Sequence, residues 1–412
     1  MRRLANGARV VSVNLPDAPL VCLDFWCQAG SVFEAPGESG MAHFLEHMVF
    51  KGSAHLQPGE FDRRVEALGG SSNAATGFDD VHYHLLIPPD GAVEALDLLL
   101  DLVLEPRLDD QAFQLERQVV LEELAQSEDQ PEEVALQRLL GAGCPDHAYG
   151  EPILGRRDQL LAQTPEAMAA FHRRLYTADR CLLTLSGCID PGAAHTIALQ
   201  ERLAASSLAR LKPAAAAALR SLPPLAVRPG EHRLRLPRLE SARLLMLWEL
   251  PAAADLHGVM GADLLTSLLA EGRRSRLVDR LRERLRLVES IDLDLHVLEC
   301  GSLGLLEAIA EEEDLPAIRQ EIGAALSELA AEEIAPAEWR RSQRLVANGY
   351  RFGLESAGGV AAALGSQHLW GHGLPLDAPL RDLERWDAGA LVRETLPLLA
   401  PQRACVLEAV PA

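Results

Sequence analysis

The order of predicted strands and helices occurs twice along the chain, and this recurrence limits the folds that the chain can adopt. Half-buried strands alternate apolar and polar residues, whereas helices bury one face at a longer period. The first half is predicted to hold strands at 8–29, 81–87 and 180–187, and helices near 40–52, 58–68, 90–104, 109–127, 131–142 and 164–176. The second half is predicted to hold strands at 232–238, 242–249, 286–298 and 302–308, and helices at 254–270, 274–284, 314–331 and 336–352. Strand pairs and helices without strict βαβ alternation predict an α+β fold, in which each half forms a mostly antiparallel sheet packed with helices.

The length of the chain, 412 residues, is too great for one ordinary hydrophobic core and favours two domains. Between residues 208 and 231 the composition shifts to Ala, Pro and Arg, as in an interdomain linker. We therefore expect two homologous α/β-layer domains, at 1–210 and 232–412, joined by a linker at 211–231.

The composition disfavours several classes of protein. A formal charge of −21 argues against nucleic acid as a partner, since phosphate binding needs a basic face. No apolar run reaches the roughly 18 residues that a membrane-spanning helix needs. The N-terminus lacks the apolar stretch of a signal peptide, so a soluble cytoplasmic protein is expected; a leader already trimmed away would indicate the periplasm instead. Seven scattered cysteines without a CxxC pair predict reduced thiols.

A short stretch near the start of the chain has the residue pattern of a metal site. His43, Glu46 and His47 form a His-x-x-Glu-His sequence. On a helix, residues four apart lie one above the other, so both imidazoles can reach one metal ion. Glu46 lies beside them, where its carboxylate is placed to take a proton from a metal-bound water. This combination is the inverted zinc-peptidase signature.

A catalytic zinc site needs a third protein ligand and an open position for water. The predicted helix at 109–127 offers Glu116, Glu122 and Glu123. Glu116 and Glu123 are seven residues apart and share one face of the helix, whereas Glu122 points roughly 100° away from them. The spacing alone leaves both glutamates of the shared face as candidates.

Several stretches resemble the pitrilysin family of zinc peptidases, which includes insulin-degrading enzyme and the mitochondrial processing peptidase. They are Ala29-Gly30-Ser31, Gly40 to Gly52, Asn73-Ala74, Glu116 to Glu123, Tyr149 to Gly155 and Phe171 to Tyr176. The resemblance covers essentially the whole chain and is closest to the half-length members, such as the processing-peptidase beta subunit and bacterial heterodimeric relatives. It implies two homologous domains, of which the first carries the zinc site.

The resemblance also implies a role for each residue of that site. Glu123 lies 76 residues after His47, as the distal ligand does in the family, and so joins His43 and His47 in holding one Zn²⁺ per chain. Glu116 matches an acidic residue that holds a ligand or the water in place; an ordinary exposed helix glutamate is the alternative. Glu46 is then the general base of a zinc-dependent endopeptidase that hydrolyses peptides or short unfolded polypeptides.

Substrate contacts are implied in the same way. In relatives, the segment that matches Asn73 and Ala74 is an edge strand that pairs with an extended peptide substrate. A plain strand and turn would explain the same two residues. Phe50 matches part of the pocket beside the scissile bond, although burial in the core explains it as well.

The second half departs from the family pattern at one position. Ser275 to Glu283 resembles a family segment whose late arginine, here Arg282, acts with a tyrosine seven positions later on the substrate and the transition state. The tyrosine position is Glu289, whose carboxylate cannot donate the phenol's hydrogen bond and would repel a developing oxyanion. Relatives of this length are half-enzymes that close a chamber with a second two-domain unit. We therefore expect a heterodimer whose homologous partner supplies the Arg/Tyr pair; a homodimer that uses Arg282 alone is the alternative.

Two other kinds of function compete with a peptidase. Some family members are non-catalytic peptide-binding or structural core subunits, but these typically lose the zinc residues, which are intact here. A serine or cysteine hydrolase is disfavoured because the sequence has no G-x-S-x-G nucleophile elbow. The phosphate-binding loop of nucleotide hydrolases is also absent from the sequence.

Overall fold

A computed structural model describes residues 1–214 and 222–412. Residues 215–221, part of the predicted linker at 211–231, lie outside the described residues. The chain divides into two compact units, the first drawn from 1–125, 152–221 and 353–376 and the second from 126–151, 222–352 and 377–412. Within the described part of the chain, no helix combines the length and the apolar character that crossing a membrane would require.

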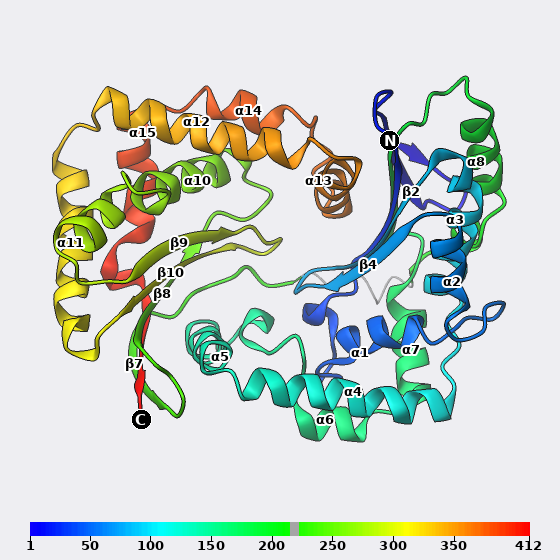
Figure 1. The fold of residues 1–412 in the computed structure, drawn as a ribbon, viewed down its shortest axis with the longest axis horizontal. Helices are drawn as coiled ribbons and strands as arrows, with labels where there is room; N and C mark the ends of the chain where they lie inside the picture. The colour runs from blue at the N-terminus through cyan, green and yellow to red at the C-terminus, as the bar shows by residue number, and fades with distance from the viewer. Residues whose placement is uncertain (215–221) are drawn as a thin grey trace. The chain divides into compact units, whose positions relative to one another are not determined.

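The first unit contains a sheet whose described strands follow the order β1-β2-β6-β3-β5-β4. These strands are β1 (Arg2–Arg3), β2 (Arg9–Asn14), β3 (Val21–Cys27), β4 (Ser71–Thr76), β5 (Val81–Ile87) and β6 (Cys181–Gly187). Figure 1 labels two of these strands, β2 and β4. The helices of this unit are α1 (Met41–Val49), α2 (Glu60–Ala67), α3 (Ala92–Leu104), nearly all of α4 (Asp110–Glu128), α6 (Arg157–Ala162), α7 (Pro165–Leu175), α8 (Ala194–Ala204), α9 (Ser207–Arg210) and α13 (Ala357–Leu369).

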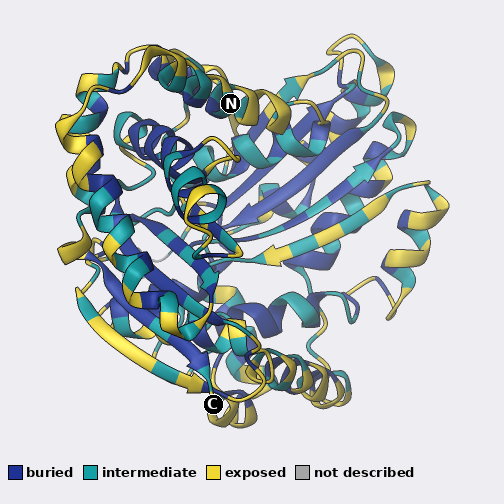
Figure 2. Cartoon of the chain, turned by 60° about the vertical axis from the view of Figure 1, so that its left-hand side comes forward, coloured by how far each residue is buried: buried dark blue, intermediate teal, exposed yellow. Residues whose placement is uncertain are grey.

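The alternation of residues in β5 separates the two faces of this sheet. Its odd-numbered residues are buried in the main core of the unit, together with residues of α1, α3 and α7. His82 and His84 point to the opposite face, on which α13 packs over β3 and β6. Because both faces are covered, β3 and β6 are buried along their whole length, as the dark blue strands of Figure 2 show.

The second unit contains a sheet whose described strands follow the order β7-β11-β8-β10-β9. These strands are β7 (Gly230–Leu236), β8 (Ala242–Leu250), β9 (Ser290–His296), β10 (Ser302–Ala310) and β11 (Cys405–Pro411). The helices of this unit are α5 (Pro131–Gly143), α10 (Leu256–Ala270), α11 (Leu315–Ala331), nearly all of α12 (Pro336–Gly353), α14 (Ala378–Leu383), α15 (Ala388–Ala390) and two π-helices at Val278–Arg284 and Leu391–Thr395.

The two sheets share one plan. In each, the last strand of the unit in sequence, β6 or β11, lies between the first two long strands; it runs parallel to β2 or β7 and antiparallel to β3 or β8. The remaining neighbours in both described sheets are antiparallel. The prediction of an α+β fold with two homologous, mostly antiparallel sheets packed with helices is therefore confirmed.

Two helices, α5 and α13, do not belong to the same unit as the helix that precedes them in the sequence. α5 follows α4 along the chain but packs on β8 and β11 of the second unit. α13 comes between α12 and α14 along the chain but packs on β3 and β6 of the first unit. The hydroxyl of Ser186, on β6, donates a hydrogen bond of 2.5 Å to the carbonyl oxygen of Ala357, the first residue of α13. This bond holds the start of α13 on the sheet. The two helices occupy corresponding places on the two sheets, so each unit is completed by a reciprocal exchange.

Candidate metal centre

The helix that carries the His-x-x-Glu-His residues, α1, has a start fixed by local interactions. Gly40 caps it with a φ of +80°, and a Cβ added there would lie 2.7 Å from the carbonyl oxygen of Leu154, so only glycine fits. The carboxyl group of Glu34 accepts the N–H groups of Gly40 at 3.0 Å and of Ala42 at 2.9 Å. Burial raises the pKa of Glu34 to about 8, although these hydrogen bonds act in the opposite direction. The first turn of the metal-site helix is thus held from a loop that precedes it.

Three side chains from two helices converge at one point. His43 and His47 come from α1, and Glu123 comes from α4. The Nε2 atoms of the two histidines lie 3.3 Å apart. Oε2 of Glu123 lies 3.6 Å from Nε2 of His43 and 3.4 Å from Nε2 of His47. The structure therefore brings together the three residues that were predicted to hold a metal ion.

The separations between these donor atoms fit a zinc ion. Ligands about 2.1 Å from a tetrahedral zinc lie about 3.4 Å from one another, close to all three observed distances. The side chains of His43, His47 and Glu123 are 9%, 22% and 43% exposed. The cluster is thus closed on the His43 side and open on the Glu123 side, where a water or a substrate can approach.

The environment of His43 favours a neutral imidazole. Burial, together with the neighbouring His47, lowers the pKa of His43 to about 4. A neutral ring keeps the lone pair that a metal ligand needs. Nδ1 of His43 is buried and has no hydrogen-bond partner among the described residues. A buried polar atom without a partner is destabilising and is more typical of a functional site than of a core.

Glu116 lies behind the cluster and orients His47. Its Oε1 is 3.0 Å from Nδ1 of His47, and its Oε2 accepts a hydrogen bond from Nζ of Lys51 at 2.7 Å. Burial would raise the pKa of Glu116, but the bonds from His47 and Lys51 lower it, so the group is a carboxylate at neutral pH. Because a carboxylate only accepts, Nδ1 of His47 carries a proton, and Nε2 is the nitrogen whose lone pair can bind a metal ion at the cluster.

The carboxylate of Glu46 is held by a strand. Its Oε2 accepts a hydrogen bond from the hydroxyl of Thr76, the last residue of β4, at 2.5 Å. Burial raises the pKa of Glu46, and the Thr76 hydrogen bond and the nearby His47 oppose that shift. A partly desolvated carboxylate in a fixed orientation suits a general base.

The predicted substrate-binding residues lie at the end of the first sheet. Among the described strands, β4 pairs only with β5, so its other edge is free. On that strand Asn73 is exposed and Ala74 is half-buried. The N–H of Ala74 donates to Oδ1 of Asn73 at 2.9 Å. Phe50 follows α1 and is half-buried, with its ring centroid 5.8 Å from that of Phe61 and 6.3 Å from that of Tyr83.

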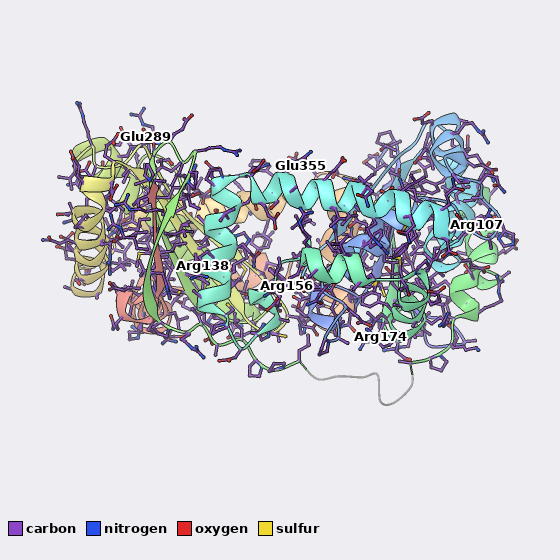
Figure 3. All side chains as sticks on the ribbon, turned by 90° about the horizontal axis from the view of Figure 1, so that it is seen from below. Arg107, Arg138, Arg156, Arg174, Glu289 and Glu355 are labelled. Carbon is purple, nitrogen blue, oxygen red and sulfur yellow. The ribbon has the colours of Figure 1, made fainter. Side chains whose placement is uncertain are left out.

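Arg282 and Glu289 both belong to the second unit. Arg282 lies in the π-helix, and its guanidinium donates to Oε1 of the adjacent Glu283 at 2.8 Å. Glu289 is exposed and immediately precedes β9 (Figure 3). The part of Arg282 in catalysis stays a prediction.

Three residues around the centre were not found from the sequence: Glu34, Lys51 and Thr76. Lys51 lies four residues after His47, and this helical spacing was a usable signal for a contact on the same side. Glu34 and Thr76 act across a loop and from another strand, so no local spacing marks either of them.

Two family models match the chain one after the other. The model described as "Insulinase (Peptidase family M16)" matches residues 9–157, which include the whole metal centre. The model described as "Peptidase M16 inactive domain" matches residues 163–346. The chain belongs to peptidase family M16. This is the pitrilysin family, so the resemblance inferred from the motifs is confirmed.

Relatives within this family are named as zinc proteases. An uncharacterized zinc protease of Mycobacterium leprae is 28% identical over 384 residues, which are 89% of this chain and 81% of the relative. The uncharacterized zinc protease YmxG of Bacillus subtilis is 32% identical over 185 residues, 45% of each chain. The M16 chain described here is thus similar over most of its length to proteins that carry a zinc-protease name.

Two solved structures share the fold. A protease from Helicobacter pylori superposes with a TM-score of 0.88 at 24% identity and covers 100% of this chain and 98% of its own. A structure from Pseudomonas fluorescens, described as a peptidase M16 inactive domain, superposes with a TM-score of 0.87 at 19% identity, again covering 100% of this chain and 98% of its own. The second unit of this M16 chain has α10 at the place in the plan that α1 has in the first, and α10 carries no His-x-x-Glu-His sequence.

Proposed function

We propose that this M16 chain is a zinc-dependent endopeptidase in which His43, His47 and Glu123 hold one zinc ion. The observation that carries the proposal is the triangle of donor atoms, with edges of 3.3, 3.4 and 3.6 Å, beside the half-buried carboxylate of Glu46. Two imidazoles and one carboxylate are a ligand set of catalytic zinc, which leaves a fourth position open. The zinc-protease names of the relatives support the same class of reaction.

The residues of the chain perform the proton transfers of peptide-bond hydrolysis. Zinc, when bound, supplies Lewis-acid chemistry that lowers the pKa of water and polarises the scissile carbonyl. Glu46 accepts the proton of the attacking water while the new C–O bond forms. As the C–N bond breaks, Glu46 returns that proton to the leaving amine. Thr76 keeps the carboxylate of Glu46 in one orientation during both transfers.

The substrate docks on the free edge of β4. The outward amide of Ala74 is occupied by the side chain of Asn73, at 2.9 Å. A peptide carbonyl that replaces this side-chain oxygen would add the substrate to the sheet as a further strand. Only an extended chain can pair in this way, so short peptides and unfolded polypeptides are the expected substrates. Phe50 lies beside β5 and contributes to a pocket for a side chain near the scissile bond.

The active assembly includes a second two-domain subunit. Glu289 stands where the family resemblance places a tyrosine that assists the transition state. A homologous partner without the zinc motif would supply an Arg/Tyr pair, which makes a heterodimer the expected form. A homodimer that relies on Arg282 is the alternative.

A second candidate function is a non-catalytic, peptide-binding subunit. The glutamate at 289 favours it, since a carboxylate disfavours the negative charge that develops on the carbonyl oxygen. The intact set of His43, His47 and Glu123 favours catalysis, because a subunit that only binds peptides has no need of a zinc site with an open position.

Chelation and reconstitution of the purified chain test the proposal. The chain is assayed on a quenched-fluorescent peptide mixture, alone and co-purified with an M16 homologue that lacks the zinc motif. We expect hydrolysis in at least one of these preparations, loss of hydrolysis after chelation, and recovery with one equivalent of Zn²⁺. We also expect Glu123→Gln to lose both zinc and hydrolysis. Zinc-loaded preparations that bind peptides but never hydrolyse them would contradict the proposal and support the non-catalytic role.

A further inference from the structure

A second group of metal-ligating side chains lies on the other face of the first-unit sheet. Asp24 on β3 and His84 on β5 are direct cross-strand partners. His82 lies two residues before His84 and therefore projects from the same face. One ligand atom from each of the three residues lies within 4.8 Å of the other two. The intervening Tyr83 points to the opposite face, where its ring meets that of Phe50 after α1, so this group is separate from the candidate zinc centre.

We propose that Asp24, His82 and His84 form a second metal site, which takes Zn²⁺ or another divalent ion of the first transition row. Two imidazoles and one carboxylate are the donors that such ions prefer, whereas magnesium and calcium prefer oxygen alone. Both histidines are half-buried, which leaves them accessible to an ion from solvent. The site is independent of the proposed peptidase activity.

The burial of Asp24 supports a cation at this place. Its residue is 1% exposed, and Oδ1 lies 3.1 Å from Nδ1 of His82. Among the described residues, no lysine or arginine forms an ion pair with it. A buried carboxylate is costly unless a positive group neutralises it. A protonated His82 can supply that charge, and a metal ion between Asp24 and the histidines would take the place of this proton.

The histidines are partly arranged for metal binding. The ring of His82 stacks on Trp26, its cross-strand partner, with centroids 4.2 Å apart and planes at 13°. The ring of His84 lies 5.7 Å from that of His82 at 18°. His84 has no hydrogen-bond partner within the described chain, so its ring can turn to bring a nitrogen to the ion at little cost. Trp26 therefore fixes one ligand, and a rotation of His84 completes the set.

A metal ion at this site would cross-link the strands next to the free edge. Asp24 belongs to β3, and His84 is also the partner of Asn73 on β4. An ion that binds the folded sheet and not the unfolded chain raises the stability of the fold by mass action. The expected role is therefore to stiffen the sheet on which a peptide would dock.

Zinc counting on the full chain tests this inference. The wild type and variants are stripped by chelation, reloaded with Zn²⁺ alone, desalted and analysed for zinc per chain. We expect two equivalents in the wild type, one in His84→Ala and one in the double variant His43→Ala/His47→Ala. The exposed His296, on β9 of the second unit, is the matched control, and His296→Ala should keep two equivalents.

The difference in zinc content between the wild type and His84→Ala tests the second site, whether or not the centre at His43, His47 and Glu123 binds zinc. Equal zinc contents in these two proteins would overturn it, as would a double variant His43→Ala/His47→Ala that keeps no zinc. If His84→Ala fails to fold, zinc anomalous diffraction from the wild type decides: a peak between Asp24 and His84 supports the site, and peaks confined to other places overturn it. If the double variant keeps two equivalents and His84→Ala loses one, the second site stands and the proposed peptidase centre fails.

Discussion

The hydroxyl of Thr76 donates a hydrogen bond to Oε2 of Glu46 across 2.5 Å, which ties the proposed general base to the last residue of the edge strand. A hydrogen bond to a charged group contributes roughly 1.5–3 kcal/mol. We expect Thr76→Val to lower kcat roughly 10- to 100-fold with the zinc content unchanged, because the carboxylate loses its orientation. Thr76→Ser keeps the hydroxyl and should recover most of the rate in the same steady-state assay. A Thr76→Val protein with an unchanged kcat would show that the contact has no catalytic role.

The contact between Glu116 and His47 leads to a prediction about metal affinity. Loss of a carboxylate that orients a histidine ligand typically weakens metal binding by about 10- to 100-fold. We expect such a loss in Glu116→Gln, measured by zinc titration against a competing chelator. Glu122→Gln, at an exposed position of the same helix, is the matched control and should bind zinc as the wild type does. Equal affinities of the two variants would mean that Glu116 is only an ordinary helix glutamate.

The amide of Ala74 allows a test of strand addition. This N–H donates to Asn73 and not to β5, so a proline at 74 removes it without breaking the sheet. One lost hydrogen bond should raise KM for a peptide substrate roughly five- to tenfold, with kcat and zinc content little changed. Ala74→Ser retains the amide and should have the KM of the wild type. A proline variant with normal KM would argue that the peptide binds elsewhere.

His172 on α7 gives the fold a dependence on pH. Burial lowers the pKa of this imidazole to about 4, although its hydrogen bond to the carbonyl oxygen of Val103 opposes the shift. In the unfolded chain the pKa is about 6.5, so the unfolded state binds more protons between pH 6.5 and pH 4. Stability should therefore fall as the pH falls through this window, by at most about 3 kcal/mol from this group.

Denaturant unfolding of metal-free protein at pH 7 and pH 5 measures this effect. His172→Gln keeps a donor for Val103 but cannot take up the proton, so its free energy of unfolding should fall less between the two pH values than that of the wild type. His296→Gln, at an exposed position, should retain the wild-type difference. Identical pH dependence in the wild type and His172→Gln would show that another group is responsible.

Much of the fold could be predicted because its strong elements carry local signals. The strand predicted at 81–87 is β5 without change, and the helix predicted at 164–176 is α7, whose first turn is capped by the side chain of Thr164. α13 was not predicted: its sequence is rich in Ala and Gly, and its position depends on packing against β3 and β6. The exchange of α5 and α13 is a tertiary choice between two similar sheets, for which no local residue pattern exists.

In the candidate site, too, residues with a local sequence signal could be predicted, and residues brought together only by the fold could not. The spacing of His43, Glu46 and His47 indicated a metal site on a helix, and family resemblance added Glu123. Thr76 contacts Glu46, which is 30 residues away in the sequence, and Glu34 contacts Ala42, which is 8 residues away. Both contacts depend on the folded backbone, so a pattern along one helix cannot reveal them. Asp24 and His84 become neighbours only through the register of β3 with β5.

The most direct test of the central claim is a paired measurement of zinc content and peptide hydrolysis in Glu46→Gln. Glutamine preserves the size of the side chain and can still accept the Thr76 hydrogen bond, but it cannot take up a proton at neutral pH. We expect one zinc ion in the His43, His47 and Glu123 centre, as in the wild type, and a kcat lower by about 10²- to 10⁴-fold. Glu46→Gln that hydrolyses peptides at the wild-type rate would contradict the assignment of the base and of the mechanism built on it.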